Sequence, residues 1–299
     1  MKKLMFVVAM TSAFAAVAAD VAKTEKTDAK PAEVATEESP LFWGFANYGV
    51  YSGYQLYGSL VNCEPTLQGY VEGNFNLSIA DLDLGYLGVG VWSNSDLTKR
   101  RNDYYLGNMF NEWDFNVHWA RTFWFDDDKV WGLTYRTSVV WYYYPHENYN
   151  NNRISNKTTI DWNHYFELTN PYLVPYVNVV KEYKRTMANL VQFGVKKPFQ
   201  ITDEFSLCPF IEMVWRESRY NWCFPTGFGA LETNSGLATL KLELDGTYMF
   251  TENFGIFAKI AFCSVIDRDL RNNIDQLAPN AYGGTKDYVW GGIGITCSF

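Results

Sequence analysis

The sequence lacks the long apolar runs of a helical membrane protein. Beyond residue 19, the 299-residue chain has no stretch of about 20 consecutive apolar residues, which excludes transmembrane helices. Charged residues are scarce, at 19 %, and the formal net charge of -8 argues against nucleic acid as a partner. Aromatic residues reach 18 %, although the mean hydropathy is only -0.21. This combination is typical of a barrel whose strands face lipid on one side and water on the other.

Residues that carry chemistry are also few. Of the three histidines, His118 and His164 fall in predicted strands where no serine stands two positions away, which leaves a Ser–His pair only across strands. Glycine-rich phosphate loops and metal-type cysteine spacings are absent. We therefore predict no enzyme, no catalytic residue, no cofactor and no metal site. Among the five cysteines, Cys63 and Cys223 fall in predicted loops, and whether they pair stays open.

The N-terminus has the pattern of an export signal. Lys2 and Lys3 precede an apolar run over 4–17, and small residues precede Asp20, so residues 1–19 are predicted to be a cleaved signal peptide. A buried N-terminal helix is the alternative. Residues 20–40 are rich in Ala, Lys, Glu, Thr and Pro without an aromatic residue, and this composition predicts a disordered periplasmic linker. Residues 41–299 then form one domain.

From Leu41 onward, polar and apolar residues alternate in segments of about ten residues. The clearest is 235–250, where Leu240, Leu242 and Leu244 alternate with Lys241, Glu243 and Asp245. A strand of this length with an unbroken charged face suits a membrane crossing with water on one side. The pattern predicts about twelve strands, near 43–56, 67–78, 84–94, 110–123, 131–144, 158–169, 173–184, 188–199, 205–217, 235–250, 253–266 and 287–299.

The connections between these strands fall into two alternating classes. The short ones are 79–83, 124–130, 170–172, 200–204 and 251–253, and the others are mostly longer and more polar. This alternation over an even number of strands predicts an all-β fold, a transmembrane antiparallel up-and-down barrel with short turns in the periplasm and long loops outside. The 185–187 connection is too short for its class. Whether the 267–286 loop folds into the lumen is left open.

The charged face of each strand is expected to point into the barrel. Because isolated charges in a dry core are costly, the interior is either wet or densely paired. We weigh a passive pore, with a slight cation preference because acids outnumber bases, against a plugged interior without conductance. Inward aromatic residues, namely Tyr70, Tyr142, Tyr144, Tyr165 and Trp290, either guide a sugar or nucleoside or fill space. The predicted pore lining is Glu72, Glu112, Asp114, Arg136, Asp161, Glu167, Lys196, Glu212, Arg216, Lys241, Glu243, Asp245 and Lys259.

The last strand ends the chain on an aromatic residue. Phe299 shares an apolar face with Val289, Ile293 and Ile295, and this face is expected to meet lipid. By resemblance to outer-membrane proteins generally, a terminal Phe is an insertion signal read by the barrel-assembly machinery. Replacing Phe299 should therefore impair assembly more than its lost burial explains.

Residues 52–70, SGYQLYGSLVNCEPTLQGY, resemble the opening hairpin of a bacterial family. The family is the uncharacterised TorF-like family of outer-membrane porins. Its hairpin pattern, which this stretch resembles, is an aromatic residue, a Gly shortly after it, and Pro-x-Leu-Gln-Gly at the start of the next strand. Here those positions are Tyr54, Gly58, Pro65, Leu67, Gln68 and Gly69, while Tyr57 stands where the family commonly has Arg. Residues 85–96, GYLGVGVWSNSD, are similar to that family's next strand, so the resemblance covers about 45 residues. It implies a barrel with a transport role. It supplies no substrate.

Together these features predict a barrel of the bacterial outer membrane, exported through a cleaved signal peptide. The expected function is a porin-like channel for passive diffusion of small polar solutes. The alternative is a non-conducting surface barrel whose loops bind partners or mediate adhesion. The expected partners are outer-membrane lipid, small polar solutes and the barrel-assembly machinery.

Overall fold

The computed structural model describes residues 40–57, 59–62, 64–79, 82–97, 112–145, 158–184, 186–221, 234–276 and 286–299. The predicted signal peptide, nearly all of the predicted linker, and both Cys63 and Cys223 lie outside these residues. Pro40–Phe299 is a compact unit.

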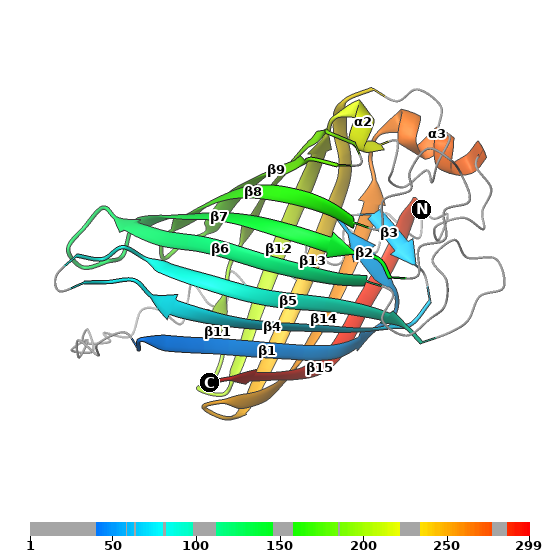
Figure 1. Cartoon of the computed structure of the whole chain (residues 1–299). Helices are drawn as coiled ribbons and strands as arrows, with labels where there is room; N and C mark the ends of the chain where they lie inside the picture. Colours follow the sequence, from blue (N-terminus) through cyan, green and yellow to red (C-terminus); the bar gives the residue numbers. More distant parts are fainter. Residues whose placement is uncertain are drawn as a thin grey trace. The chain divides into compact units, whose positions relative to one another are not determined.

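Twelve long strands form a closed antiparallel barrel, which confirms the predicted fold (Figure 1). Each pairs with its neighbours in sequence, and β1 closes the ring by pairing with β15. Successive side chains alternate between the two faces of a strand, so the period-two pattern of the sequence is what separates the wall into an outer and an inner face. The strands are β1 (Phe42–Tyr51), β4 (Thr66–Asn76), β5 (Tyr86–Asp96), β6 (Glu112–Trp124), β7 (Gly132–Tyr143), β8 (Thr158–Thr169), β9 (Val174–Glu182), β10 (Asn189–Lys196), β12 (Phe205–Arg216), β13 (Gly236–Thr251), β14 (Phe254–Val265) and β15 (Asp287–Ser298).

Smaller elements occur between the barrel strands. β2 (Tyr54–Leu56) and β3 (Ser59–Asn62) form a separate two-stranded hairpin, and β11 (Phe199–Gln200) adds a short segment beside β12. α2 (Ser218–Asn221) and α3 (Arg268–Gln276) lie in two of the long connections. In the described part of the chain, no helix has the length and apolarity needed to cross a membrane.

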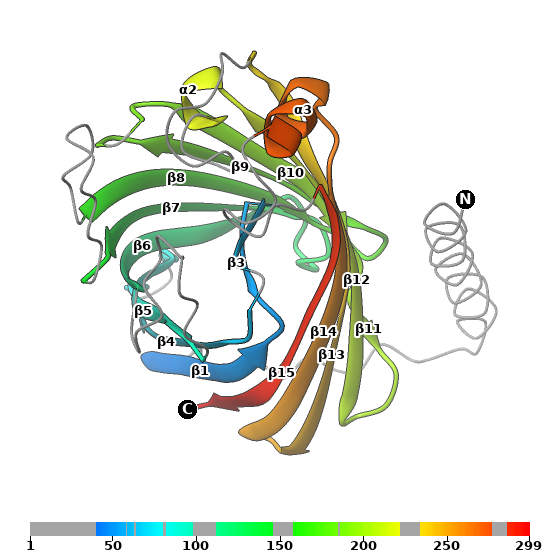
Figure 2. The same ribbon diagram turned by 90° about the vertical axis from the view of Figure 1, so that its right-hand side faces the viewer.

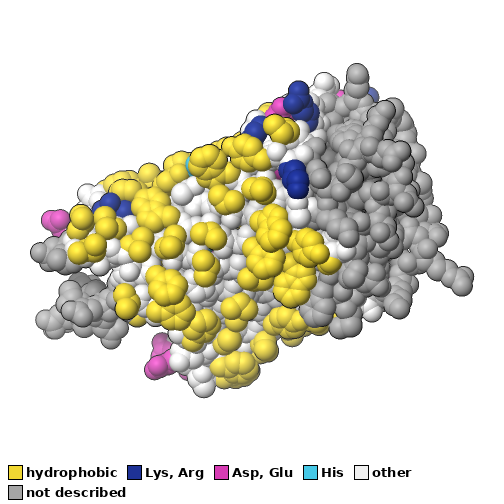
Figure 3. Space-filling model, viewed as in Figure 1, with side chains coloured by type: hydrophobic (Ala, Val, Ile, Leu, Met, Phe, Trp, Pro, Cys, Tyr) yellow, Lys and Arg dark blue, Asp and Glu magenta, His cyan; other side chains and the backbone are white. Residues whose placement is uncertain are grey.

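The outer face of the barrel is apolar. Val71 and Val117 are each 52 % exposed, and Ile293 on the last strand is 61 % exposed. Figure 3 shows hydrophobic side chains spread over the visible wall, with charged side chains near its ends. Such a face requires an apolar solvent, because soluble monomers rarely expose contiguous apolar patches of this extent.

The barrel has two different ends. We call the end with residues 77–79, 82–85, 125–131, 170–173, 197–204 and 252–253 the short-turn end, and the other the long-loop end. β1 begins and β15 ends at the short-turn end, where the amide of Gly44 donates to the carbonyl of Phe299 at 2.8 Å and the Phe299 amide donates back at 3.0 Å. A Cβ on Gly44 would lie 2.6 Å from the Phe299 ring, so glycine leaves room for the terminal aromatic side chain.

Two connections at the long-loop end differ from expectation. The first predicted strand, 43–56, is too long, because β1 ends at Tyr51 and the chain turns inward there. The short connection after β9 is possible because Glu182 organises it. The carboxylate accepts hydrogen bonds from the amides of Lys184 at 2.7 Å and Met187 at 3.0 Å, and from the Thr186 hydroxyl at 2.7 Å. The buried Glu182 carboxylate thus stabilises the turn by accepting its hydrogen bonds and is not available to the lumen.

Candidate functional site: the barrel interior

The register places the predicted pore lining on one inward face. Paired residues of neighbouring strands share a face, and Lys259 pairs with Asp245, Lys241 with Glu212, and Asp161 with Glu182. Following such pairs around the ring brings together the side chains of Glu72, Glu112, Asp114, Arg136, Asp161, Glu167, Lys196, Glu212, Arg216, Lys241, Glu243, Asp245 and Lys259. That solutes pass them stays a prediction.

Residues 53–62, the inner hairpin, fold back into the barrel at the long-loop end. Figure 2 shows β3 inside the ring of strands. At the base of the hairpin, the Trp290 indole nitrogen donates to the Gly53 carbonyl at 2.8 Å, and the Thr66 hydroxyl donates to the same oxygen at 3.2 Å. The Tyr54 hydroxyl donates to Glu112 on β6 at 3.1 Å. The hairpin, which leaves the wall after β1, is therefore bound by β15 on one side of β1 and by β4 and β6 on the other.

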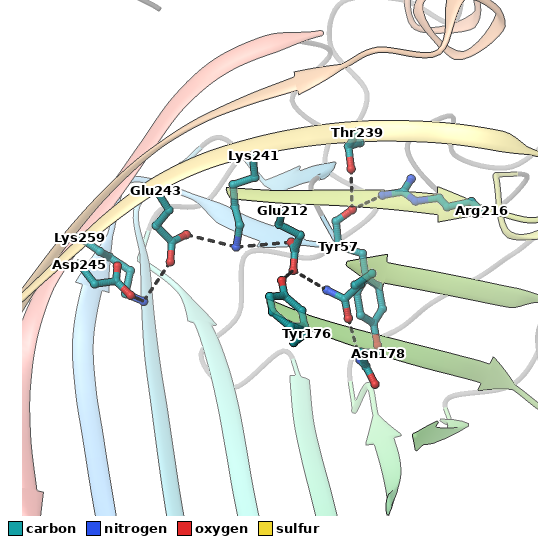
Figure 4. A network of polar contacts seen from close by, with 11 residues as sticks. Tyr57, Tyr176, Asn178, Glu212, Arg216, Thr239, Lys241, Glu243, Asp245 and Lys259 are labelled. Carbon is teal, nitrogen blue, oxygen red and sulfur yellow. Dashed lines mark hydrogen bonds and ion pairs between the residues drawn. The ribbon is translucent and has the colours of Figure 1, made fainter. Parts of the chain in front are cut away.

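The tip of the inner hairpin is Tyr57. Its hydroxyl donates to Asp161 on β8 at 3.1 Å and lies 3.2 Å from the Tyr142 hydroxyl. Its carbonyl accepts hydrogen bonds from Arg216 and, at 3.3 Å, from Thr239 (Figure 4). Burial and then the Asp161 carboxylate raise the pKa of the Tyr57 phenol well above its ordinary value, so the phenol stays protonated and can donate.

Tyr57 also has an unusual backbone. Its φ of 48° lies in the left-handed region, which costs a residue with a Cβ about 1 kcal/mol or more. The hydrogen bonds to Asp161, Arg216 and Thr239 compensate for this strain. The conformation is thus maintained by contacts with the barrel wall.

Apolar contacts accompany these hydrogen bonds. Leu60 packs with Ala261, Cys263, Tyr288 and Trp290 on β14 and β15. The Tyr57 ring packs against a second buried cluster, whose members are Val180, Ala188, Leu190, Val214 and Tyr220. Because its contacts reach β6 and β8 as well as β12 to β15, the inner hairpin crosses the bore.

We call the inward residues around the inner hairpin the hairpin half. Here three charged residues of the predicted lining are buried: Glu112 and Asp161 are each 2 % exposed and Arg216 is 0 % exposed. Asp114 lies between them in the register, opposite Tyr142. Glu112, Asp161 and Arg216 hold the hairpin, a role that the sequence pattern of their own strands does not reveal.

The remaining inward residues, toward the short-turn end, form the turn half. A ladder of alternating charges runs across β12, β13 and β14 (Figure 4). Lys259 Nζ lies 3.5 Å from Asp245 and 3.8 Å from Glu243, while Lys241 Nζ lies 3.3 Å from Glu243 and 3.5 Å from Glu212. Each carboxylate thus has a base beside it.

The ladder ends on neutral partners. Glu212 accepts hydrogen bonds from the Tyr176 hydroxyl at 2.6 Å and from Gln192 at 3.1 Å. Tyr176 stacks on Phe210 with a centroid separation of 5.7 Å, and Lys241 Nζ lies 4.5 Å from the Phe210 ring centroid. Rings and bases thus share this part of the wall.

A second cluster surrounds Glu72 on β4. Arg136 lies 3.1 Å from its carboxylate and His118 lies 3.7 Å away. Tyr70 also donates to Glu72, and Asn74 donates at 3.2 Å. Farther around the inward face, Lys196 on β10 and Glu167 on β8 form a separate pair at 2.6 Å. The Tyr165 hydroxyl donates to the same carboxylate.

The two halves differ in their access to solvent. In the turn half the Arg136 and Lys196 side chains are 32 % and 33 % exposed, and Asp245 is 37 % exposed. Charges in the wall of a closed barrel retain such exposure only if the space in front of them admits water. The turn half therefore has hydrated charges beside buried carboxylates such as Glu72, whereas Glu112, Asp161 and Arg216 of the hairpin half are all covered by protein.

Of the predicted inward aromatic residues, four donate or share hydrogen bonds with other residues of the interior and Tyr144 is buried. Tyr70 and Tyr165 bind wall carboxylates, Tyr142 meets Tyr57, and Trp290 binds Gly53. The contacts therefore support a structural role, in which these aromatic side chains fill the interior and bind neighbouring residues. Tyr54 and Tyr57 were missed as site residues, because Tyr54 continues the alternation of the preceding strand and Tyr57 falls in a predicted loop.

The register also brings Ser138 directly opposite His118 and beside Asn163, the cross-strand arrangement that the sequence leaves open. The His118 ring instead lies 3.0 Å from Arg136 and near Glu72 and Asn116. No hydrogen bond joins Ser138 to His118 in the described residues. Nor do the residues described include a metal-type group of His, Cys, Asp and Glu side chains.

Solved structures with this architecture come from bacterial outer membranes. An outer-membrane channel from Pseudomonas putida F1 superimposes with a TM-score of 0.50 over 91 % of this chain and all of its own, at 10 % identity. The fold is that of an outer-membrane β-barrel. The KdgM porin in complex with disordered oligogalacturonate gives a TM-score of 0.44 at 7 % identity, covering 86 % of this chain and 99 % of its own. Outer membrane phospholipase A from Escherichia coli gives 0.43 at 9 % identity, over 85 % and 92 %.

No protein-family model matches the chain, and neither does the sequence of any curated protein. At these identities the structural likeness establishes the fold. The narrower TorF-like resemblance of residues 52–70 stays a prediction.

Proposed function

We propose that this protein is an outer-membrane channel for passive diffusion of small polar solutes, narrowed at its long-loop end by the inner hairpin. The observation that carries the proposal is the hydrated charge of the turn half. Arg136, Lys196 and Asp245 remain about one-third exposed inside a closed barrel. A barrel that served only as an anchor would need no such surface, because side chains alone can fill a small bore.

The test is single-channel conductance of the purified barrel in a planar bilayer. The diagnostic variant replaces residues 53–64 with a short Gly-Ser linker between β1 and β4. Removing the hairpin should give a larger conductance than the wild type, because the segment that crosses the bore is gone. A control variant replaces residues 268–276 of α3 with the same linker, which shortens the long-loop end without removing the hairpin.

The alternative, a non-conducting barrel with loop-mediated binding or adhesion, is favoured by one observation. The hairpin that crosses the bore is bound by four different strands, through Trp290, Glu112, Asp161 and Arg216. A segment held in this way can block the bore. If both the wild type and the hairpin-deletion variant are silent in the bilayer, the channel proposal fails and this alternative remains. We propose no catalytic role for the interior.

We also propose that Phe299 is the insertion signal and that the short-turn end faces the periplasm. Phe299 is 57 % exposed and its ring lies 6.0 Å from that of Phe42, so little burial is lost in Phe299→Ala. The variant should nevertheless show reduced outer-membrane levels in cells. Phe254→Ala, at a similarly exposed aromatic residue of the same end, is the control. Equal surface levels of Phe299→Ala and the wild type would contradict the proposal.

A further inference from the structure

Three ion pairs of the turn half share one orientation, and the pair of Asp245 and Lys259 has the opposite one. In the pair of Glu72 and Arg136, the acid is 4 % exposed and the base is 32 % exposed. In the pair of Glu243 and Lys259 the values are 8 % and 24 %. Lys196, at 33 %, is again more exposed than its acid partner, at 19 %. On different strands of the barrel, the base therefore lies on the lumen side of the acid.

This orientation has a structural cause. The carboxylates are held back by neutral donors of the wall, such as Tyr70 and Asn74 at Glu72, and Tyr176 at Glu212. Lys and Arg carry longer stems that run along the wall and extend the charge into water. Each of these three pairs is thus a dipole with its positive end toward the lumen.

The excess of acid over base on the inward face belongs mostly to the hairpin half. Glu112 is bound by Tyr54 and Asp161 by Tyr57, while Glu182 binds the turn at the end of β9. All three are at most 4 % exposed. These acids contribute to the formal charge of the interior, but little of their surface is available to a solute.

We propose that the turn half presents positive charge to solutes and that the channel prefers small anions to cations. This inference rests on the proposed channel function, and it reverses the slight cation preference that counting inward acids and bases predicts. Asp245, 37 % exposed beside Lys259, is the one acid of the ladder that opposes the preference.

The experiment measures the reversal potential in a potassium chloride gradient, for the wild type and for the variant without residues 53–64. Chloride should be the more permeant ion in both. A variant with Arg136→Gln, Lys196→Gln and Lys259→Gln should lose the preference. Each lost charge should change the chloride-to-potassium permeability ratio by about fourfold, because one charge roughly 10 Å away in water favours chloride about twofold and disfavours potassium about twofold.

Asp245→Asn is the matched control of opposite sign, because it removes an exposed charge from the same ladder. It should raise the chloride-to-potassium ratio. Folding of every variant is checked by the mobility difference between boiled and unboiled samples on a gel. Potassium preference in the wild type, or a ratio unchanged in the folded triple variant, would overturn the anion preference and leave the channel function intact. Absence of current with and without the hairpin would overturn both.

Discussion

The hairpin half and the turn half of the interior use the same residue types with different partners. In the hairpin half, Glu112 and Asp161 accept hydrogen bonds from hydroxyl groups of the hairpin, and Arg216 binds the Tyr57 carbonyl. In the turn half, acids face bases and water, as in the pair of Glu167 and Lys196. The difference shows that an inward charge can serve either to hold a segment or to face solutes.

The energetic consequence follows from solvent access. A buried charge that loses its partner is destabilised by its full desolvation penalty, whereas a hydrated charge recovers interactions with water. Equivalent substitutions should therefore have large effects in the hairpin half and small effects in the turn half.

The largest difference is expected between Arg216→Met and Lys196→Met. Arg216→Met removes a fully buried donor to the Tyr57 carbonyl and should lower the free energy of unfolding by about 3 kcal/mol. Lys196→Met removes a base that is one-third exposed and should cost less than about 1 kcal/mol. Urea unfolding in lipid vesicles measures both. Equal losses would remove the distinction between the halves.

An intermediate effect is expected for Tyr57→Phe. This change removes the hydrogen bond to the buried Asp161 carboxylate and should cost about 2 kcal/mol of unfolding free energy. It should also make the conductance fluctuate, because the hairpin tip is released from β8. Tyr48→Phe on the outer face, where the side chain is 44 % exposed, is the control and should stay within about 0.5 kcal/mol of the wild type. An unchanged unfolding free energy and a steady conductance in Tyr57→Phe would show that the hydrogen bond to Asp161 is not needed to fix the hairpin.

The smallest effect is expected in a double-mutant cycle on Glu167→Gln and Lys196→Gln. The coupling energy of this hydrated pair should be below about 1 kcal/mol. It should decrease further between 0.1 M and 1 M salt, since the Debye length shortens from about 10 Å to about 3 Å. A coupling of about 3 kcal/mol that salt does not change would indicate that the turn half is as dry as the hairpin half.

Much of the barrel follows from the sequence for a local reason. Alternation over 235–250 places Leu240 and Leu244 on one face and Lys241 and Asp245 on the other, whatever the rest of the chain does. The number of strands and their inward residues follow in the same way. The short connection after β9 looked anomalous because its stabilising acceptor, Glu182, lies in the strand before it.

The inner hairpin could not be predicted in this way. The Ser52–Gly53 dipeptide is a local turn signal between β1 and β2, but it does not show that the chain turns into the barrel there. The turn inward depends on contacts of Gly53 with Trp290 and of Tyr57 with Arg216, which are distant in sequence.

The sequence by itself determined which face of the wall each strand residue occupies, because a period of two is a property of the extended backbone. Only the tertiary structure decided which inward charges meet water. Arg136 and Arg216 are equivalent in the pattern, yet one is 32 % exposed at its side chain and the other is fully buried. The physical reason is that solvent access depends on where residues 53–62 lie, and their position is set by contacts with strands far away in the chain.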